Sequence, residues 1–199
     1  MFDTTLRQAK DRVGTPLALR LGAFSPNAVS VGGFVVGLLA AWQASQGNGA
    51  SAVILWLFSR VLDGLDGLIA RLHGKQSDFG GYLDIVLDFV VYAAVPIGLT
   101  LSAPTPDRFI ALAVMLSSFY VNAASWMMLA AILEKRGRAE GGLTTVTMPP
   151  GLIGALETIA AYTAFLLWPE QMVWLYGVFA ALVGATIIQR LVWAWRHLR

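Results

Sequence analysis

The feature that most constrains this chain is a succession of long apolar segments, separated by short connectors that contain charged residues, glycine or proline. About 20 consecutive apolar residues, folded as a helix, are enough to cross the hydrocarbon core of a bilayer. Hydrophobic residues make up 57% of the sequence and charged residues only 13%, a balance that is atypical of soluble domains. The sequence therefore predicts an all-α, polytopic membrane protein with about six transmembrane helices.

Proline, glycine and polar residues mark where these helices begin and end. Ser25 and Pro26 predict a helix start, with the serine as N-cap and the proline at the first helical position. The spans are expected at about residues 28–44, 50–71, 81–101, 108–133 and 151–168, and from the turn at Pro169 to the C-terminus. Small residues in the first span would permit close helix contact, namely Gly32, Gly33 and Gly37.

Residues 1–22 are charged and are interrupted by Gly14 and Pro16. Apolar residues recur there at steps of four, three and four: Phe2, Leu6, Ala9 and Val13. This period is typical of an amphipathic helix lying on the membrane surface, and a basic tail without regular structure is the alternative. Residues 1–199 are then expected to form a single membrane domain, in which this juxtamembrane segment precedes a transmembrane bundle over 23–199.

Four carboxylates lie at the ends of the second and third spans: Asp63, Asp66, Asp84 and Asp88. The first two are three residues apart and the last two are four apart, so each pair shares one helix face. An aspartate inside a membrane costs about 2.5–3.5 kcal/mol on insertion scales. A chain that only had to span the membrane would not need to carry these acids. Paired carboxylates are hard oxygen ligands that suit Mg²⁺ or Mn²⁺, and these ions bind phosphate.

Two arginines offer the acids partners other than a metal ion. The carboxylates could form internal ion pairs with Arg60 and Arg71, or they could reach into the lipid headgroups. Arg60 lies one helical turn before Asp63, so its guanidinium could pair with that carboxylate or with a phosphate.

The acids belong to a longer pattern, D-x2-D-G-x2-A-R-x8-G-x3-D-x3-D, in which every constrained position is filled. The residues that fill it are Asp63, Asp66, Gly67, Ala70, Arg71, Gly80, Asp84 and Asp88. This pattern resembles the signature of the CDP-alcohol phosphotransferase family of integral membrane enzymes. The resemblance implies that a CDP-linked donor, commonly CDP-diacylglycerol, gives its substituted phosphate to an alcohol while CMP leaves. It also implies phospholipid synthesis, two Mg²⁺ or Mn²⁺ ions in each site, and a homodimer.

The resemblance also implies a role for each residue of the signature. Asp63, Asp66 and Asp84 would be metal ligands, and Asp88 would complete the metal site and act as the general base toward the acceptor hydroxyl. The CDP donor would be bound by Asp63, Gly67, Ala70, Arg71 and Gly80, the last of these by allowing close approach. The small residues Gly67 and Ala70 could instead serve tight helix packing.

The acceptor alcohol is not specified by the signature. Glycerol 3-phosphate is the first expectation, with serine or inositol phosphate as alternatives. Arg136 and Arg138 could hold a phosphorylated acceptor or could face anionic lipid. Glu157 is expected to be a lone buried acid, which would either line the substrate pocket or form a structural hydrogen bond. Asn122, inside the fourth span, favours a hydrogen bond between helices.

Charge and residue content exclude several classes of function. The net charge of +2 does not indicate a nucleic-acid partner, and the absence of cysteine excludes thiol chemistry. His73 and His197 are too few for a histidine metal cluster. A cation-coupled transporter is the alternative from another class, but its acids would lie at the bilayer midplane rather than at one face.

The positive charges predict how the chain lies in the membrane. When alternate connectors are assigned to opposite sides, the lysines and arginines of the connectors and termini gather on one side, and only Arg108 falls on the other. The positive-inside rule then makes both termini and the mouth of the acidic site cytoplasmic in a multi-pass protein of the cell inner membrane.

Overall fold

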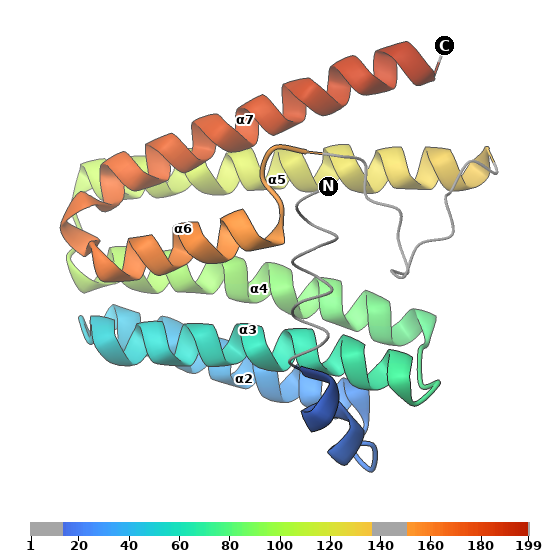
Figure 1. Ribbon diagram of the computed structural model, residues 1–199. Helices are drawn as coiled ribbons and strands as arrows, with labels where there is room; N and C mark the ends of the chain where they lie inside the picture. Colours follow the sequence, from blue (N-terminus) through green and yellow to red (C-terminus); the bar gives the residue numbers. More distant parts are fainter. Residues whose placement is uncertain (1–13, 137–150, 199) are drawn as a thin grey trace.

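The computed structural model describes residues 14–136 and 151–198 and is helical almost throughout (Figure 1). The helices are α2 (Pro26–Ser45), α3 (Gly49–Leu72), α4 (Asp78–Ser102), α5 (Pro106–Lys135), α6 (Ala155–Leu167) and α7 (Met172–His197), with a short 3₁₀ turn, η1 (Pro169–Gln171), before α7. Their order is the one that the sequence predicts. The chain is an all-α, polytopic membrane protein.

Four described helical segments are long and apolar enough to cross a membrane: α2, α4, α5 and the continuous stretch Pro169–His197. Helix α3 has a comparable length of 24 residues, but it carries Arg60, Asp63 and Asp66 close together. Helix α6 has only 13 residues. It begins at Ala155 rather than near residue 151, because Gly154 has an extended backbone that does not continue a helix.

The helix starts follow from local capping. Pro26 opens α2 as expected, but Ser25 makes no side-chain capping bond and contributes only its extended backbone. The α4 helix begins earlier than predicted because Ser77 accepts a hydrogen bond from the backbone N–H of Gly80, at 3.0 Å. Thr105 caps α5 in the same way. These caps hold the ends of α4 and α5 at defined positions.

Close contacts between helices depend on glycines at two levels of the bundle. A Cβ on Gly37 of α2 would stand 2.7 Å from the side chain of Val91, and a Cβ on Gly98 of α4 would stand 2.2 Å from the carbonyl oxygen of Ala41. Larger residues at either position would push α2 and α4 apart. The prediction of close packing is thus confirmed for Gly37, whereas a Cβ on Gly32 would meet nothing within 4 Å.

An aromatic cluster joins the two halves of the bundle. Trp56 of α3 stacks on Tyr162 of α6, with ring centroids 5.1 Å apart, and Phe165 meets Tyr176 of α7 edge-on at 4.8 Å. Pro96 lies inside α4, and because proline has no N–H, the carbonyl of Tyr92 loses its usual helical donor. The buried hydroxyl of Tyr162 donates to that carbonyl at 2.7 Å. Tyr162 therefore ties α6 to α4 at the break in its hydrogen bonding.

The segment before α2 is attached to the end of α3. Residues 14–20 are helical and include Gly14 and Pro16. Ala18 is buried in a small second cluster with Leu65, Leu68 and Ile69. The ammonium of Lys75 donates to the carbonyl of Gly22 at 2.6 Å. The predicted apolar stripe from Phe2 to Val13 lies outside the described residues.

Removing the Tyr162 hydroxyl tests whether its hydrogen bond replaces the donor that Pro96 takes from α4. We expect Tyr162→Phe to lower stability by about 1–3 kcal/mol, because the buried carbonyl of Tyr92 would lose its donor. In a Pro96→Ala background residue 96 regains its N–H, so the same change should cost less. Thermal unfolding in detergent measures both, with Tyr120→Phe as control because Tyr120 is 76% exposed. Equal costs in the two backgrounds would contradict a repair role for this hydroxyl.

Candidate active site

The four carboxylates predicted to act together come from the end of α3 and the start of α4. Asp63, Asp84 and Asp88 line one pocket, to which α2 contributes Ser30 and Gly33. The connector between α3 and α4, the last turn of α5 and the C-terminal end of α7 lie at the same end of the bundle (Figure 1). The acids are therefore confined to the half of the bundle that carries most of the cationic helix ends.

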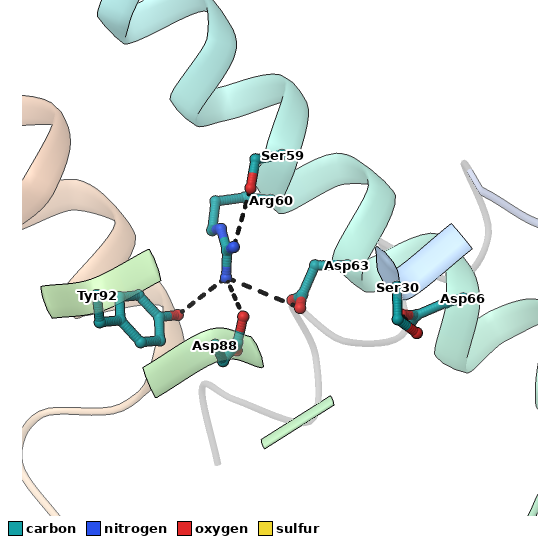
Figure 2. Close-up of polar contacts among 7 residues, drawn as sticks. All are labelled: Ser30, Ser59, Arg60, Asp63, Asp66, Asp88 and Tyr92. Carbon is teal, nitrogen blue, oxygen red and sulfur yellow. Dashed lines mark hydrogen bonds and ion pairs between the residues drawn. The ribbon is translucent and has the colours of Figure 1, made fainter. Parts of the chain in front are cut away.

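Arg60 is the cation at the centre of this site. Its Nη1 donates to Asp88 Oδ1 at 2.6 Å and lies 3.8 Å from Asp63 Oδ1 (Figure 2). The sequence left open whether this guanidinium pairs with Asp63 or with a phosphate. In the structure its main partner is Asp88, 28 residues away along the chain and on the next helix.

The guanidinium of Arg60 is also enclosed by aromatic and polar groups. Only 5% of the residue is exposed. Its Cζ lies 4.9 Å from the ring centroid of Trp56 and 5.2 Å from that of Tyr92, which are cation–π distances. Its Nη2 donates to Ser59 Oγ at 2.9 Å, and its Nε has no hydrogen-bond partner. Burial makes the attraction to Asp88 stronger than it would be in water.

Asp66 does not contact Arg60 and instead has a partner on α2. It is 5% exposed, and the hydroxyl of Ser30 donates to its Oδ2. Figure 2 shows this pair to one side of the group around Arg60. Ser30 lies on the first turns of α2 and is not among the site residues that the sequence predicts. Its position one turn after Pro26, in the half of the first span that begins near the acids, was the only sequence signal for it.

The donor chemistry of the site fits a divalent metal ion, but the arrangement of the donors does not. Carboxylates are the ligands that Mg²⁺ and Mn²⁺ take. Within residues 14–136 and 151–198, however, no three histidine or acidic side chains are placed so that they could hold one ion together. Asp88 is engaged by Arg60 and Asp66 by Ser30. A metal ion at Asp88 would therefore share this carboxylate with the guanidinium of Arg60.

The small residues of the signature differ in what surrounds them. A Cβ on Gly67 would meet, among the described residues, only the guanidinium end of Arg71 at 3.3 Å. Within the described part of the chain, a glycine at this position is therefore not required for tight packing against a neighbouring helix. A Cβ on Gly80 would stand 3.0 Å from Asn27 Oδ1, so this glycine allows α2 to approach the start of α4. Ala70 is half-buried on the same helix as Gly67.

The two described candidate acceptor residues, Arg136 and Glu157, do not line this pocket. Arg136 directly follows α5, is exposed, and donates to the carbonyl of Leu198 at 2.9 Å. Arg138 lies outside the described residues. The expectation that Glu157 is a buried acid is wrong: it is exposed in the first turn of α6, and its carboxylate accepts a hydrogen bond from the N–H of Gly154 at 3.0 Å. A carboxylate at a helix N-terminus satisfies free N–H groups there, which accounts for its position.

A second buried arginine is one that the sequence does not single out. Arg190 of α7 is 5% exposed, and its Nη1 donates to Asn122 Oδ1 on α5 at 2.8 Å. The predicted interhelical hydrogen bond of Asn122 is confirmed. From the sequence, Arg190 is only one of the cations that orient the chain, because a charge near a helix end gives no indication of which way it faces.

The comparisons with known proteins agree on one family. The family model for CDP-alcohol phosphatidyltransferase matches residues 23–188. The inner membrane protein YnjF of Escherichia coli is 34% identical over 172 residues, which cover 85% of this chain and 82% of that protein. The archaetidylinositol phosphate synthase of Methanothermobacter thermautotrophicus is 28% identical over 189 residues, 92% of this chain and 89% of that protein.

Solved structures show the same fold. The phosphatidylinositol phosphate synthase of Mycobacterium tuberculosis with CDP-DAG bound superimposes with a TM-score of 0.71 at 24% identity, covering 92% of this chain and 94% of that one. The same synthase in complex with manganese and citrate gives a TM-score of 0.70 at 24% identity, covering 92% and 88%.

The bond between Ser30 and Asp66 can be tested on stability. We expect Ser30→Ala to lower stability by about 1.5–3 kcal/mol, the range for a hydrogen bond to a charged group. Ser45→Ala is a matched control on the same helix, because the Ser45 hydroxyl donates only to the carbonyl of Trp42, at an exposed position. Thermal unfolding in detergent measures both variants. Equal midpoints for the two would show that Ser30 does not support Asp66.

Proposed function

The chain belongs to the CDP-alcohol phosphatidyltransferase family, and on this basis we propose that it transfers a substituted phosphate from a CDP-linked lipid to a small polar alcohol, releasing CMP. The observation that carries the proposal is the meeting of Asp63, Asp84 and Asp88, from two helices, in one pocket. CDP-diacylglycerol is the donor we propose. The related synthase from Mycobacterium tuberculosis with CDP-DAG bound supports this choice.

We place the donor along the C-terminal half of α3, with Asp63, Gly67, Ala70, Arg71 and Gly80 as its contacts. The open side of Gly67, which no neighbouring described helix covers, supports this placement. The guanidinium of Arg71 lies close to Gly67 and would offer its charge to a phosphate.

Mg²⁺ or Mn²⁺, as two ions held by Asp63, Asp66, Asp84 and Asp88, is part of the proposal. The manganese complex of the Mycobacterium tuberculosis synthase supports a metal in this fold. When bound, the metal would offset the charge of the diphosphate and stabilise the oxygen that leaves with CMP. The four acids would have to converge further than they do here, because no three of the described acids are placed to hold an ion.

Asp88 is the residue to which we assign the proton transfer. It would take the proton from the acceptor hydroxyl, whose oxygen then bonds to the phosphorus that carries the lipid. The bond from that phosphorus to the bridging oxygen breaks, and CMP leaves with this oxygen. Because Asp88 lines the pocket and bonds Arg60 through one oxygen, its other oxygen could face an acceptor.

The acceptor is a choice among small polar alcohols. The two synthases reported above are named for inositol phosphate products, which makes inositol phosphate a first candidate to test beside glycerol 3-phosphate and serine. Arg136 and Arg138 are the residues that we propose to meet a phosphorylated acceptor. A phosphate would find charge-assisted hydrogen bonds there.

We further propose that both termini and the site face the cytoplasm of an inner-membrane protein, and that the working form is a homodimer of this single domain. The similarity to an Escherichia coli inner membrane protein supports the location. The positive-inside rule supports the orientation, because the described α5 and α7 ends at the site's end of the bundle carry Lys135, Arg136 and Arg196.

CMP release tests the proposed reaction. Purified protein in nanodiscs would receive CDP-diacylglycerol, Mg²⁺ or Mn²⁺, and one of inositol phosphate, glycerol 3-phosphate or serine. We expect CMP release that depends on one alcohol and falls by about 10²–10⁴-fold in Asp88→Asn, the range for a missing general base. Donor binding should survive in this variant. Turnover like that of the wild type would end the assignment of Asp88, and no donor binding at all would favour a transporter.

Substitution of Gly67 tests where the donor lies. We expect Gly67→Leu to weaken CDP-diacylglycerol binding by about tenfold or more, because a bulky side chain would fill the open face of α3. Gly177→Leu is the matched control, because a Cβ on Gly177 also meets nothing within 4 Å but lies on α7. Equilibrium binding of the donor measures both. Equal affinities in the two variants would place the donor elsewhere.

A further inference from the structure

Arg60 is a buried arginine that lies outside the signature, yet it occupies the centre of the signature's acids. Its side chain is 4% exposed, and its Nη1 is shared between Asp88 at 2.6 Å and Asp63 at 3.8 Å. In a low-dielectric site a carboxylate bonded this closely to a guanidinium is neutralised by it. Arg60 thus supplies a positive charge at the place where the proposed function puts a divalent cation.

The two ends of the guanidinium are held differently. Nη2 is anchored on Ser59 Oγ, the hydroxyl of the preceding residue, at 2.9 Å, whereas Nη1 reaches across to α4. The rings of Trp56 and Tyr92 lie at cation–π distance from Cζ. They would stabilise the positive charge when Nη1 no longer bonds Asp88. The side chain therefore has a place to remain after the carboxylate is released.

The acids themselves are not arranged for a metal ion while Arg60 bonds Asp88. Asp63, Asp84 and Asp88 line one pocket, but among the described side chains no three acids or histidines are placed to hold one ion together. A guanidinium and a divalent cation on oxygens of the same carboxylates repel each other. For the metal to take Oδ1 of Asp88, Nη1 of Arg60 has to give up that oxygen, and a metal on Oδ2 of the same carboxylate would still be repelled by the guanidinium.

We propose that Arg60 is a built-in counter-ion that competes with the divalent cation for Asp88 and thereby sets the metal affinity of the site. This inference rests on the proposed function, because it assumes that the acids bind a metal. Arg60 is then a positioning residue: it holds Asp88 toward the pocket before the metal binds and retreats toward Trp56 and Tyr92 when it does.

Mn²⁺ binding to the full-length protein in nanodiscs tests the proposal, with free Mn²⁺ followed by its paramagnetic resonance signal. We expect Arg60→Gln to tighten Mn²⁺ binding by about tenfold, within the range of couplings between contacting charged groups. Arg60→Lys keeps a cation and should lie closer to the wild type. Arg108→Gln removes a charge that is bonded to Ala103 and Glu170 instead, and should change nothing.

A double-mutant cycle shows whether the effect passes through Asp88. In an Asp88→Asn background, Arg60→Gln should no longer tighten Mn²⁺ binding, because the contested carboxylate is gone. Thermal unfolding gives a second measurement. Without metal, Arg60→Gln should unfold at a lower temperature than the wild type, and Mn²⁺ should raise its midpoint by more than it raises that of the wild type. If Arg60→Gln cannot be purified, Arg60→Met is measured instead, because its apolar side chain suits the aromatic surroundings of this position.

The outcomes separate this inference from the proposed function. Unchanged or weaker Mn²⁺ binding in Arg60→Gln, with CMP release by the wild type intact, would overturn the role of Arg60 alone. Tighter binding that persists in the Asp88→Asn background would also overturn it, since the competition would not be for Asp88. A wild type that neither binds Mn²⁺ nor releases CMP would overturn both proposals.

Discussion

The bond from Arg60 to Asp88 is the interaction on which the rest of the site depends. A bundle that crosses a membrane cannot leave several carboxylates uncompensated, because each buried charge loses its hydration. At 2.6 Å this ion pair neutralises Asp88 and joins the C-terminal part of α3 to the first turns of α4. It also brings Asp63 to the same pocket, since Asp63 lies one turn after Arg60 on the same helix.

The remainder of the bundle keeps these two helix ends together. Gly37 and Gly98 let α2 lie directly against α4, and Gly33 lets α2 approach α3, where Ser30 reaches Asp66. On the other side, Tyr162 bonds the carbonyl that Pro96 leaves free in α4. That carbonyl belongs to Tyr92, whose ring borders the guanidinium of Arg60. The aromatic cluster thus supports the ion pair, because the same side chains join α6 to α4 and enclose the charge.

The sequence predicted local features well, but it predicted less well which way a side chain on a helix faces. It placed the long helices within a few residues, because hydrophobic length and proline act locally. The prediction that Glu157 is buried was wrong. An acid surrounded by apolar residues in the sequence suggests burial, but the helix begins only at Ala155 and the carboxylate caps its first turn. The sequence did not identify Arg190 as a buried donor to Asn122. The sequence around a cation near a helix end does not show whether the side chain faces lipid headgroups or a neighbouring helix.

The sequence by itself determined the class of protein, the order of the helices and the family, through apolar length and a signature in which residue type and spacing are both constrained. Only the tertiary structure decided the partners within the site: Asp88 rather than Asp63 for Arg60, and Ser30 for Asp66. The physical reason is that a spacing of three or four residues specifies neighbours on one helix. Contacts between helices depend on rotation and close approach, which are set by glycines, aromatic packing and buried charge far apart in the chain.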